Sequence, residues 1–143
     1  MIHLLDVNVL IALFDPAHIH HDMAHSWFGS NREEGWATCP ITENGFIRVL
    51  SNPTYPGRRT TVVDAAERLS RFICSGHHTF WPDEVSLLDK SAFSLSRLSG
   101  HKGITDTYLL GLAVRNGGRL ATFDRGVRPD AVLGGESEHL AVL

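Results

Sequence analysis

The sequence lacks the features that would place the protein in a membrane or in a secreted, disulfide-stabilised class. No apolar run reaches the roughly 18 residues needed to cross a bilayer, and residues 1–6 show neither the basic start nor the cleavage site of a signal peptide. The two cysteines, Cys39 and Cys74, form no CxxC pair, so we expect both to be reduced. These absences favour a cytoplasmic protein with no membrane association.

Nucleotide-binding loops, internal repeats and linker-like segments are also missing. Neither a P-loop nor a GxGxxG motif is present, which removes support for nucleotide-dependent chemistry. At 143 residues with 43% hydrophobic composition, the chain is long enough to bury a core of its own. We therefore expect one domain over residues 1–143.

Excess positive charge is missing as well, because the formal net charge is -3. This excludes a protein that holds nucleic acid by its overall positive field. Only one of the 13 Lys and Arg residues, Arg32, precedes residue 48, which leaves 12 in the remainder against 10 of the 16 acids. Positive charge is thus available locally in the later part of the chain.

Short apolar runs alternate with segments of helical periodicity along the chain. The expected strands are 2–5, 35–38, 78–81, 119–123 and 139–142. The first expected helix runs from Val7 to a stop at 15–16, the second covers 18–28, and the third begins near Thr42. A fourth begins at a cap, Thr60 or Thr61, and ends at 75–76. The last two cover 84–98 and 104–116. This alternation predicts an α/β fold with an open, mainly parallel sheet covered on both faces.

Four acids stand at the ends of these predicted elements. Asp6 and Asp124 each follow an apolar strand, where open parallel sheets place ligand-binding groups. Glu43 and Asp106 lie at helix starts, where an acid taken alone is more often a cap or a partner of the helix dipole. Asp6 lies in an apolar stretch in which an unpaired carboxylate is costly, so a function is favoured there. We expect all four acids to face one edge of the sheet.

A cluster of four carboxylates requires a cation. Two unit charges about 4 Å apart repel by roughly 4 kcal/mol at an effective dielectric near 20. Oxygen-only ligands suit Mg²⁺ or Mn²⁺, which also bridge to substrate phosphates. The pattern therefore predicts metal-dependent phosphodiester hydrolysis with Asp6, Glu43, Asp106 and Asp124 as the catalytic, metal-binding residues.

The segments that carry these acids are 4–11, 42–50, 104–109 and 121–124. In this order they resemble the four motifs of PIN-domain ribonucleases. The likeness extends to VapC-type toxins of bacterial toxin-antitoxin pairs, because a turn at Asp15 and Pro16 precedes a His-rich helix that contains Trp27. Thr107 departs slightly from the family, in which a small Ala is commoner, and this bears on packing.

The resemblance implies several further properties. It implies a PIN-like three-layer fold with a five-stranded parallel sheet in the order 3-2-1-4-5, in which Asp6, Glu43, Asp106 and Asp124 bind metal and Asn8 and Thr122 support them. It implies endonucleolytic cleavage of structured RNA (tRNA, rRNA or mRNA) that inhibits translation. It also implies a VapB-like antitoxin as partner and a homodimer.

Basic side chains beside the acids are candidates for substrate binding. Arg48 shares a predicted helix with Glu43 and is expected either to orient that carboxylate or to bind a phosphate. The others flank the third and fourth acids and would contact the RNA backbone, unless they lie in solvated loops: His101, Lys102, Arg125 and Arg128.

Histidines gather at His18, His20, His21 and His25, and the last two have the i, i+4 spacing of zinc ligands. No HExxH motif and no nearby cysteine accompanies them. We therefore expect a solvated helix face, with contact to RNA phosphates as the alternative. The tryptophans Trp27, Trp36 and Trp81 lie within apolar elements and are expected in the core or an interface.

Three rival functions share parts of this pattern. A phosphatase of the haloacid dehalogenase type needs a second acid two residues after the first, and this sequence has Asn8 there. A non-catalytic PIN-like RNA-binding module would be expected to have lost one of the four acids, and none is missing. A DNA-directed nuclease stays open, because carboxylate-metal chemistry does not sense the 2'-OH.

Overall fold

The computed structural model describes all residues 1–143, and its centre is a five-stranded parallel sheet in the order β3-β2-β1-β4-β5. Each strand is short. The strands are β1 (His3–Leu5), β2 (Trp36–Thr38), β3 (His78–Phe80), β4 (Arg119–Thr122) and β5 (Leu140–Val142). The α/β fold and the strand order expected from the sequence are confirmed.

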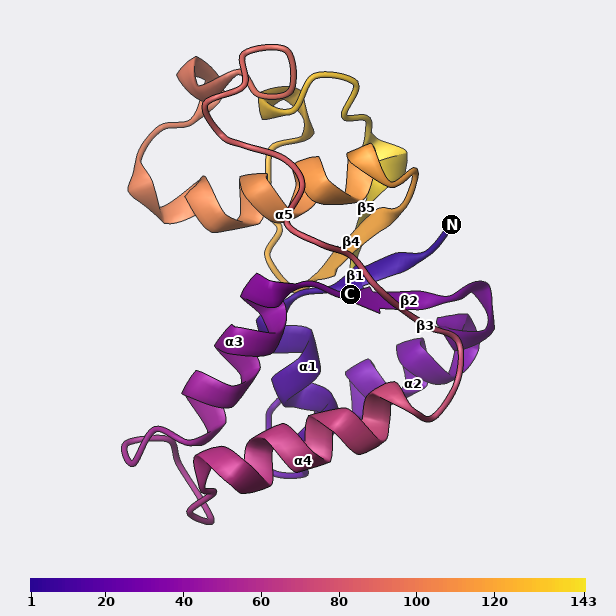
Figure 1. Ribbon diagram of the computed structural model, residues 1–143, viewed down its shortest axis with the longest axis vertical. Helices are drawn as coiled ribbons and strands as arrows, with labels where there is room; N and C mark the ends of the chain where they lie inside the picture. The colour runs from indigo at the N-terminus through magenta and orange to yellow at the C-terminus, as the bar shows by residue number, and fades with distance from the viewer.

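Helices cover both faces of this sheet (Figure 1). Four of them lie together on one side of the sheet, and α5 lies on the other side with the long loops that flank it. The α-helices are α1 (Val7–Phe14), α2 (His21–Asn31), α3 (Pro40–Leu50), α4 (Val62–Ile73) and α5 (Ile104–Arg115). The sheet is therefore the middle layer of three.

Alternation along each strand divides the hydrophobic core in two. Leu5 and Ala121 belong to the core under α1 to α4, whereas Leu4 and Leu120 belong to the core under α5. Successive side chains of a strand point to opposite faces, so a strand that is buried on both faces is apolar throughout. This accounts for the short apolar runs in the sequence.

Most predicted elements are confirmed, with ends shifted by a few residues. Thr61 caps α4 by accepting a hydrogen bond from the N–H of Asp64, as its position before the helical pattern predicted. Helix α2 begins at His21, so His18 lies in the preceding loop and not on the helix. Trp36 and Trp81 are buried, and Cys39 and Cys74 are both free.

The helix predicted over 84–98 is wrong. This segment contains turns, one bridge between Phe93 and Val132, and a single 3-10 turn at Leu95–Arg97. Side chains take the place of helical hydrogen bonds: Ser86 Oγ accepts from the N–H of Leu88, and Asp89 Oδ1 accepts from the N–H and the hydroxyl of Ser91. Ser and Asp compete with the helix in this way, which the apolar spacing does not reveal.

The order of the strands reverses between β1 and β4, because β1 pairs with both β2 and β4. In open parallel sheets the crevice at this reversal, beyond the carboxyl ends of the strands, is where ligands bind. Helices α1, α3 and α5 all begin at this edge (Figure 1). No helix of the chain is long and apolar enough to span a bilayer.

Candidate active site

Asp6 lies at the centre of the crevice, between the end of β1 and the first turn of α1. It caps α1 by accepting a hydrogen bond from the N–H of Val7 at 2.7 Å, and its side chain is only 7% exposed. Burial raises the pKa of this carboxyl above its ordinary value, and the nearby charge of Asp124 acts in the same direction. Hydrogen bonds from Thr122 and Val7 oppose that shift.

Thr122, at the end of β4, connects two of the acids. Its hydroxyl donates to Asp6 Oδ2 at 2.8 Å and accepts from the backbone N–H of Asp124 at 3.0 Å. Asp124 is itself exposed, and its Oδ1 accepts from the N–H of Gly126 at 2.7 Å. The fully buried Thr122 hydroxyl therefore fixes Asp6 relative to the turn that carries Asp124.

Asp106 enters the same crevice from the first turn of α5. Its pKa is raised to about 7, first by burial, then by the charges of Asp6 and Asp124, and also by a hydrogen bond shared with the Asp124 carboxyl. Carboxyls that repel one another this strongly lie close together. The structure thus brings Asp6, Asp106 and Asp124 into one site, as the sequence predicted.

Glu43 belongs to a separate hydrogen-bonded group at the end of β2. Its Oε1 accepts from the Thr38 hydroxyl at 2.7 Å, and that same hydroxyl lies 2.8 Å from His78 Nε2. The single hydroxyl proton goes to the carboxylate, which has none to give, so His78 Nε2 carries a proton and donates it to Thr38. Glu43 is on the same edge of the sheet but does not contribute to the pKa shifts of Asp6 and Asp106.

The donor set fits a hard divalent cation, because it consists of carboxylate oxygens whose charges repel one another. A cation between them would oppose the repulsion by Asp6 and Asp124 that, after burial, raises the pKa of Asp106. As the side chains stand, no three His, Cys, Asp or Glu side chains are arranged around a common metal position. Asp6, Asp106 and Asp124 are the residues that would hold such an ion.

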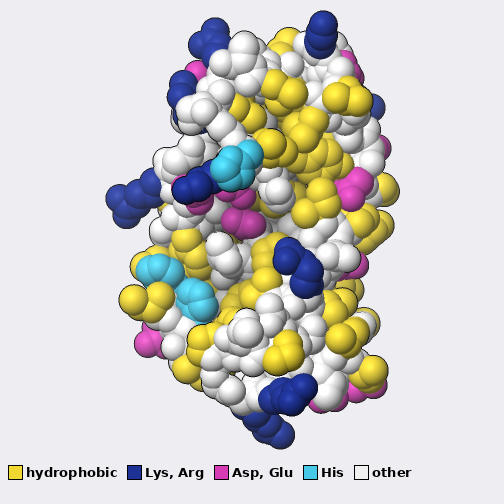
Figure 2. Space-filling view, turned by 90° about the vertical axis from the view of Figure 1, so that its left-hand side faces the viewer, with side chains coloured by type: hydrophobic (Ala, Val, Ile, Leu, Met, Phe, Trp, Pro, Cys, Tyr) yellow, Lys and Arg dark blue, Asp and Glu magenta, His cyan; other side chains and the backbone are white.

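The remaining predicted residues lie around the acids with fewer contacts. Asn8 is exposed and makes no hydrogen bond to Asp6, and Arg48 makes no ion pair with Glu43. Three other candidates are exposed and pair with no carboxylate, namely His101, Lys102 and Arg125, whereas Arg128 pairs with Asp130 at 2.8 Å. Figure 2 looks onto this edge and shows acids near the middle of the face, with histidine and Lys or Arg side chains around them.

The histidine cluster divides into two pairs, and neither forms the purely solvated helix face that was expected. His21 Nδ1 lies 2.7 Å from the carbonyl oxygen of Ala12, and His25 Nε2 lies 2.8 Å from that of Leu13. These are among the last carbonyls of α1, which lack partners within the helix. The rings of His18 and His20 instead pack against Phe123, next to Asp124.

Thr38 and His78 were not identified from the sequence, although one signal was present. Both β2 and β4 end in Ala-Thr, and both threonine hydroxyls donate to a site acid. His78 gives no such signal, because its contact depends on the β2–β3 register, which pairs Trp36 with His78 and so places His78 diagonally from Thr38.

Comparison with known proteins agrees with this architecture. Residues 3–129 match the PIN domain family. Ribonuclease VapC44 of Mycobacterium tuberculosis is 46% identical over 140 residues, which are 98% of this chain and 98% of the relative. Ribonuclease VapC39 of the same organism is 46% identical over 131 residues, 92% of this chain and 94% of the relative. The chain therefore belongs to the PIN-domain ribonucleases of the VapC type.

Proposed function

We propose that the protein is a Mg²⁺- or Mn²⁺-dependent endoribonuclease that acts as the toxin of a VapBC-type pair. The observation that supports this most strongly is the convergence of Asp6, Asp106 and Asp124 at the reversal of strand order, where burial and then the charges of Asp6 and Asp124 raise the pKa of Asp106 to about 7. Such a site is poorly matched to a structural role, because unpaired like charges destabilise the fold.

In this proposal the acids hold the metal, and the chain's other residues hold the acids. A bound ion would lower the pKa of a water molecule and stabilise the leaving oxygen of the phosphodiester. Thr122 holds Asp6 through one hydrogen bond, and Thr38 holds Glu43 through another. Asp106 would hold the ion from the first turn of α5, whose N-cap residue Gly103 provides no side-chain cap.

RNA is the proposed substrate, because the relatives are named ribonucleases. Unpaired cations around the crevice would hold its phosphates, namely Arg48, Lys102 and Arg125, with His101 beside them. Cleavage of tRNA, rRNA or mRNA would inhibit translation in the cytoplasm, where these RNAs are used. A VapB-like antitoxin would hold the enzyme inactive, and a homodimer is proposed as the toxin's assembly.

The test is cleavage of labelled RNA by purified protein freed of its antitoxin. We expect single-stranded RNA or tRNA to be cut with Mg²⁺ or Mn²⁺, no cutting with a chelator, and at least a hundredfold loss in Asp106→Asn, on the order of 3 kcal/mol. Asp22→Asn is the matched control, since Asp22 also lies in the first turn of a helix but outside the site. Equal cutting in the chelator would refute metal dependence, and cutting of DNA alone would refute the choice of substrate.

A further inference from the structure

An arginine-lined hollow lies on the molecule apart from the acids. It encloses about 680 Å³ between the end of α1, the loop from α3 to α4, and α4 itself. Four arginines line it: Arg58, Arg59, Arg68 and Arg71. Figure 2 shows Lys and Arg side chains at the lower end of the face that carries the acids, the end at which the α3–α4 loop lies in Figure 1.

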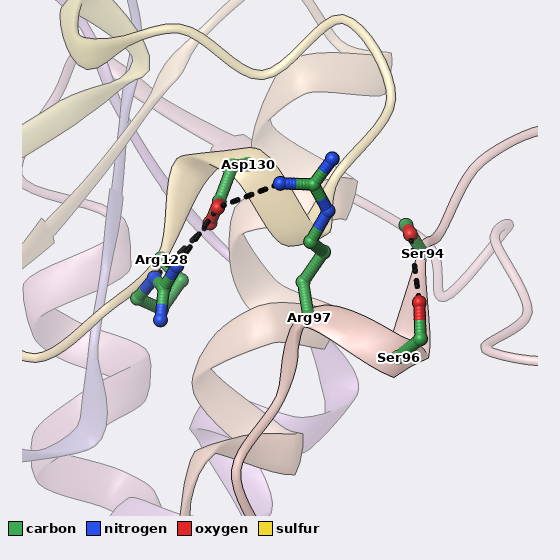
Figure 3. Close-up of polar contacts among 5 residues, drawn as sticks. All are labelled: Ser94, Ser96, Arg97, Arg128 and Asp130. Carbon is green, nitrogen blue, oxygen red and sulfur yellow. Dashed lines mark hydrogen bonds and ion pairs between the residues drawn. The ribbon is translucent and has the colours of Figure 1, made fainter.

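The positive charge of this hollow is largely uncompensated. Arg58, Arg59 and Arg68 pair with no carboxylate, and Arg71 reaches Glu67 only at 4.0 Å on the surface. By contrast, Arg97 and Arg128 both pair with Asp130, at 3.6 Å and 2.8 Å (Figure 3). With two aspartates in the lining beside the four arginines, the hollow has a formal net charge of +2.

Part of the hollow is held in place before any ligand arrives. Arg68 donates to the carbonyl oxygen of Phe14 at 3.2 Å and lies 5.3 Å from the centroid of the Phe14 ring. The Tyr55 hydroxyl donates to Asp15, one of the two aspartates of the lining, and so engages an acid that would otherwise be free to pair with the arginines. A planar guanidinium held in this way matches the oxygens of a phosphate with two parallel hydrogen bonds.

Helix α1 relates the hollow to the acids. Asp6 caps the start of α1, and Phe14, at the other end of the helix, lines the hollow. Eight helical residues span about 12 Å, a distance that a few nucleotides of RNA cover. The two features are therefore close enough to contact one strand.

From this geometry we infer that the hollow binds backbone phosphates of the RNA a few nucleotides from the cleaved bond. The inference rests on the proposed ribonuclease function. A protein of net charge -3 with acids at its centre repels RNA unless a local positive site compensates. The hollow supplies that charge on the face where the strand must lie, and its contacts are independent of base sequence.

The test measures affinity for a fluorescein-labelled single-stranded RNA as a function of salt, with all proteins carrying Asp6→Asn and a chelator present. The variant Arg58→Ala/Arg59→Ala loses two phosphate contacts, so the slope of log K against log salt becomes shallower by about 1.4. The affinity loss at about 50 mM salt is then about sevenfold larger than at about 200 mM. Arg58→Lys/Arg59→Lys keeps most of the slope, since a point charge still attracts phosphate.

The control removes two exposed, unpaired cations on the other side of the sheet from the hollow, one at the end of α5 and one in the loop before it, in the variant Lys90→Ala/Arg115→Ala, and leaves the slope unchanged. An unchanged slope in the Arg58 and Arg59 variant overturns the inference. So does a hollow that binds an acidic peptide but not RNA, which would make it a protein-docking site. If the parent enzyme cuts RNA but the Arg58 and Arg59 variant keeps the parent salt slope, phosphate binding by the hollow is refuted and the proposed ribonuclease function is not. Absence of any RNA cleavage by the parent enzyme counts instead against the proposed function.

Discussion

Two threonines at strand ends each donate a hydrogen bond to one of the acids. Thr122 donates to Asp6, and Thr38 donates to Glu43, each through a fully buried hydroxyl. A buried carboxylate that accepts such a bond loses rotational freedom at little cost, because hydrogen bonds to charged groups stabilise by about 1.5–3 kcal/mol. Orientation of the acids therefore depends on residues that do not themselves bind the ion.

The variant Thr38→Val tests whether the hydrogen bond from Thr38 orients Glu43. The methyl group keeps the volume but removes the bond to Glu43 and leaves His78 Nε2 without its acceptor. We expect kcat to fall about tenfold, equivalent to about 1.4 kcal/mol, and the Mn²⁺ concentration for half-maximal activity to rise. Both are measured in RNA cleavage assays across a metal titration.

Thr38→Ser is the matched variant, because it restores the hydroxyl and should restore the metal dependence. NMR of the histidine ring nitrogens provides a second reading without metal: His78 should carry its proton on Nε2 in the parent protein. If the Thr38→Val variant loses stability but keeps the metal dependence of the parent protein, Thr38 contributes only to packing and does not orient Glu43.

Asp106→Asn tests the repulsion among the three aspartates. The folded-state pKa of about 7 exceeds the ordinary value of 3.8, so folded protein keeps this proton while unfolded protein loses it. The free energy of unfolding of the parent protein therefore falls as pH rises from about 4 through about 7. The neutral amide avoids that loss, so Tm of the metal-free variant should match the parent near pH 4 and exceed it by about 3 °C or more near pH 8.

Differential scanning calorimetry at a series of pH values, in the presence of a chelator, measures this difference. Asp22→Asn provides the comparison for the loss of an acid in the first turn of a helix. A Tm difference that does not change with pH would show that the pKa of Asp106 is not raised in the folded protein.

At the scale of elements, the site depends on how closely α3 crosses α1. A Cβ atom built on Gly45 would lie 2.5 Å from Val7 Cγ2, well inside contact distance. Gly45 stands two residues after Glu43, and Val7 directly follows Asp6. The glycine therefore sets the spacing between the helices that carry these two acids.

Gly45→Ala should lower the free energy of unfolding by about 1–3 kcal/mol, because the added methyl forces the helices apart. Gly29→Ala in α2 is the opposite control: nothing lies within 4 Å of its Cβ position, and Ala is favoured over Gly in a helix by about 1 kcal/mol. Urea denaturation of both variants measures the two changes. A neutral or stabilising Gly45→Ala would mean that the crossing is looser than the structure shows.

The elements differ in how far the sequence predicts them. Helix α4 was predicted well because Thr61 caps it and its apolar residues recur at helical spacing. The segment 84–98 has apolar residues too, but Ser86 and Asp89 bond to nearby backbone N–H groups and stop a helix from forming. Periodicity reports which side chains can be buried, whereas such local bonds decide whether the backbone is helical.

At the scale of the whole molecule, the parallel sheet produces the site. Because β1 is central and pairs with both β2 and β4, the carboxyl ends of these strands bring together residues from the start, middle and end of the chain. The four acids were identifiable from their places after strands and at helix starts. That Asp6, Asp106 and Asp124 form one group, while Glu43 bonds to Thr38 and His78, depends on strand register and could not be read from spacing.

Charge is also organised at this scale. The acids concentrate negative charge at the crevice, and unpaired arginines line a hollow about one short helix away. A modest net charge of -3 thus conceals two regions of opposite sign. The proposed binding of a cation and of a polyanion would use these two regions separately.

The central claim is that the three aspartates share a divalent ion, and a crystal structure of the Mn²⁺-soaked protein tests it most directly. We predict an anomalous difference peak within about 2.0–2.2 Å of carboxylate oxygens of Asp6 and Asp106 or Asp124, and no such peak in Asp106→Asn crystals. Manganese bound elsewhere, with the Asp106 and Asp124 carboxyls still hydrogen-bonded to each other, would contradict the account.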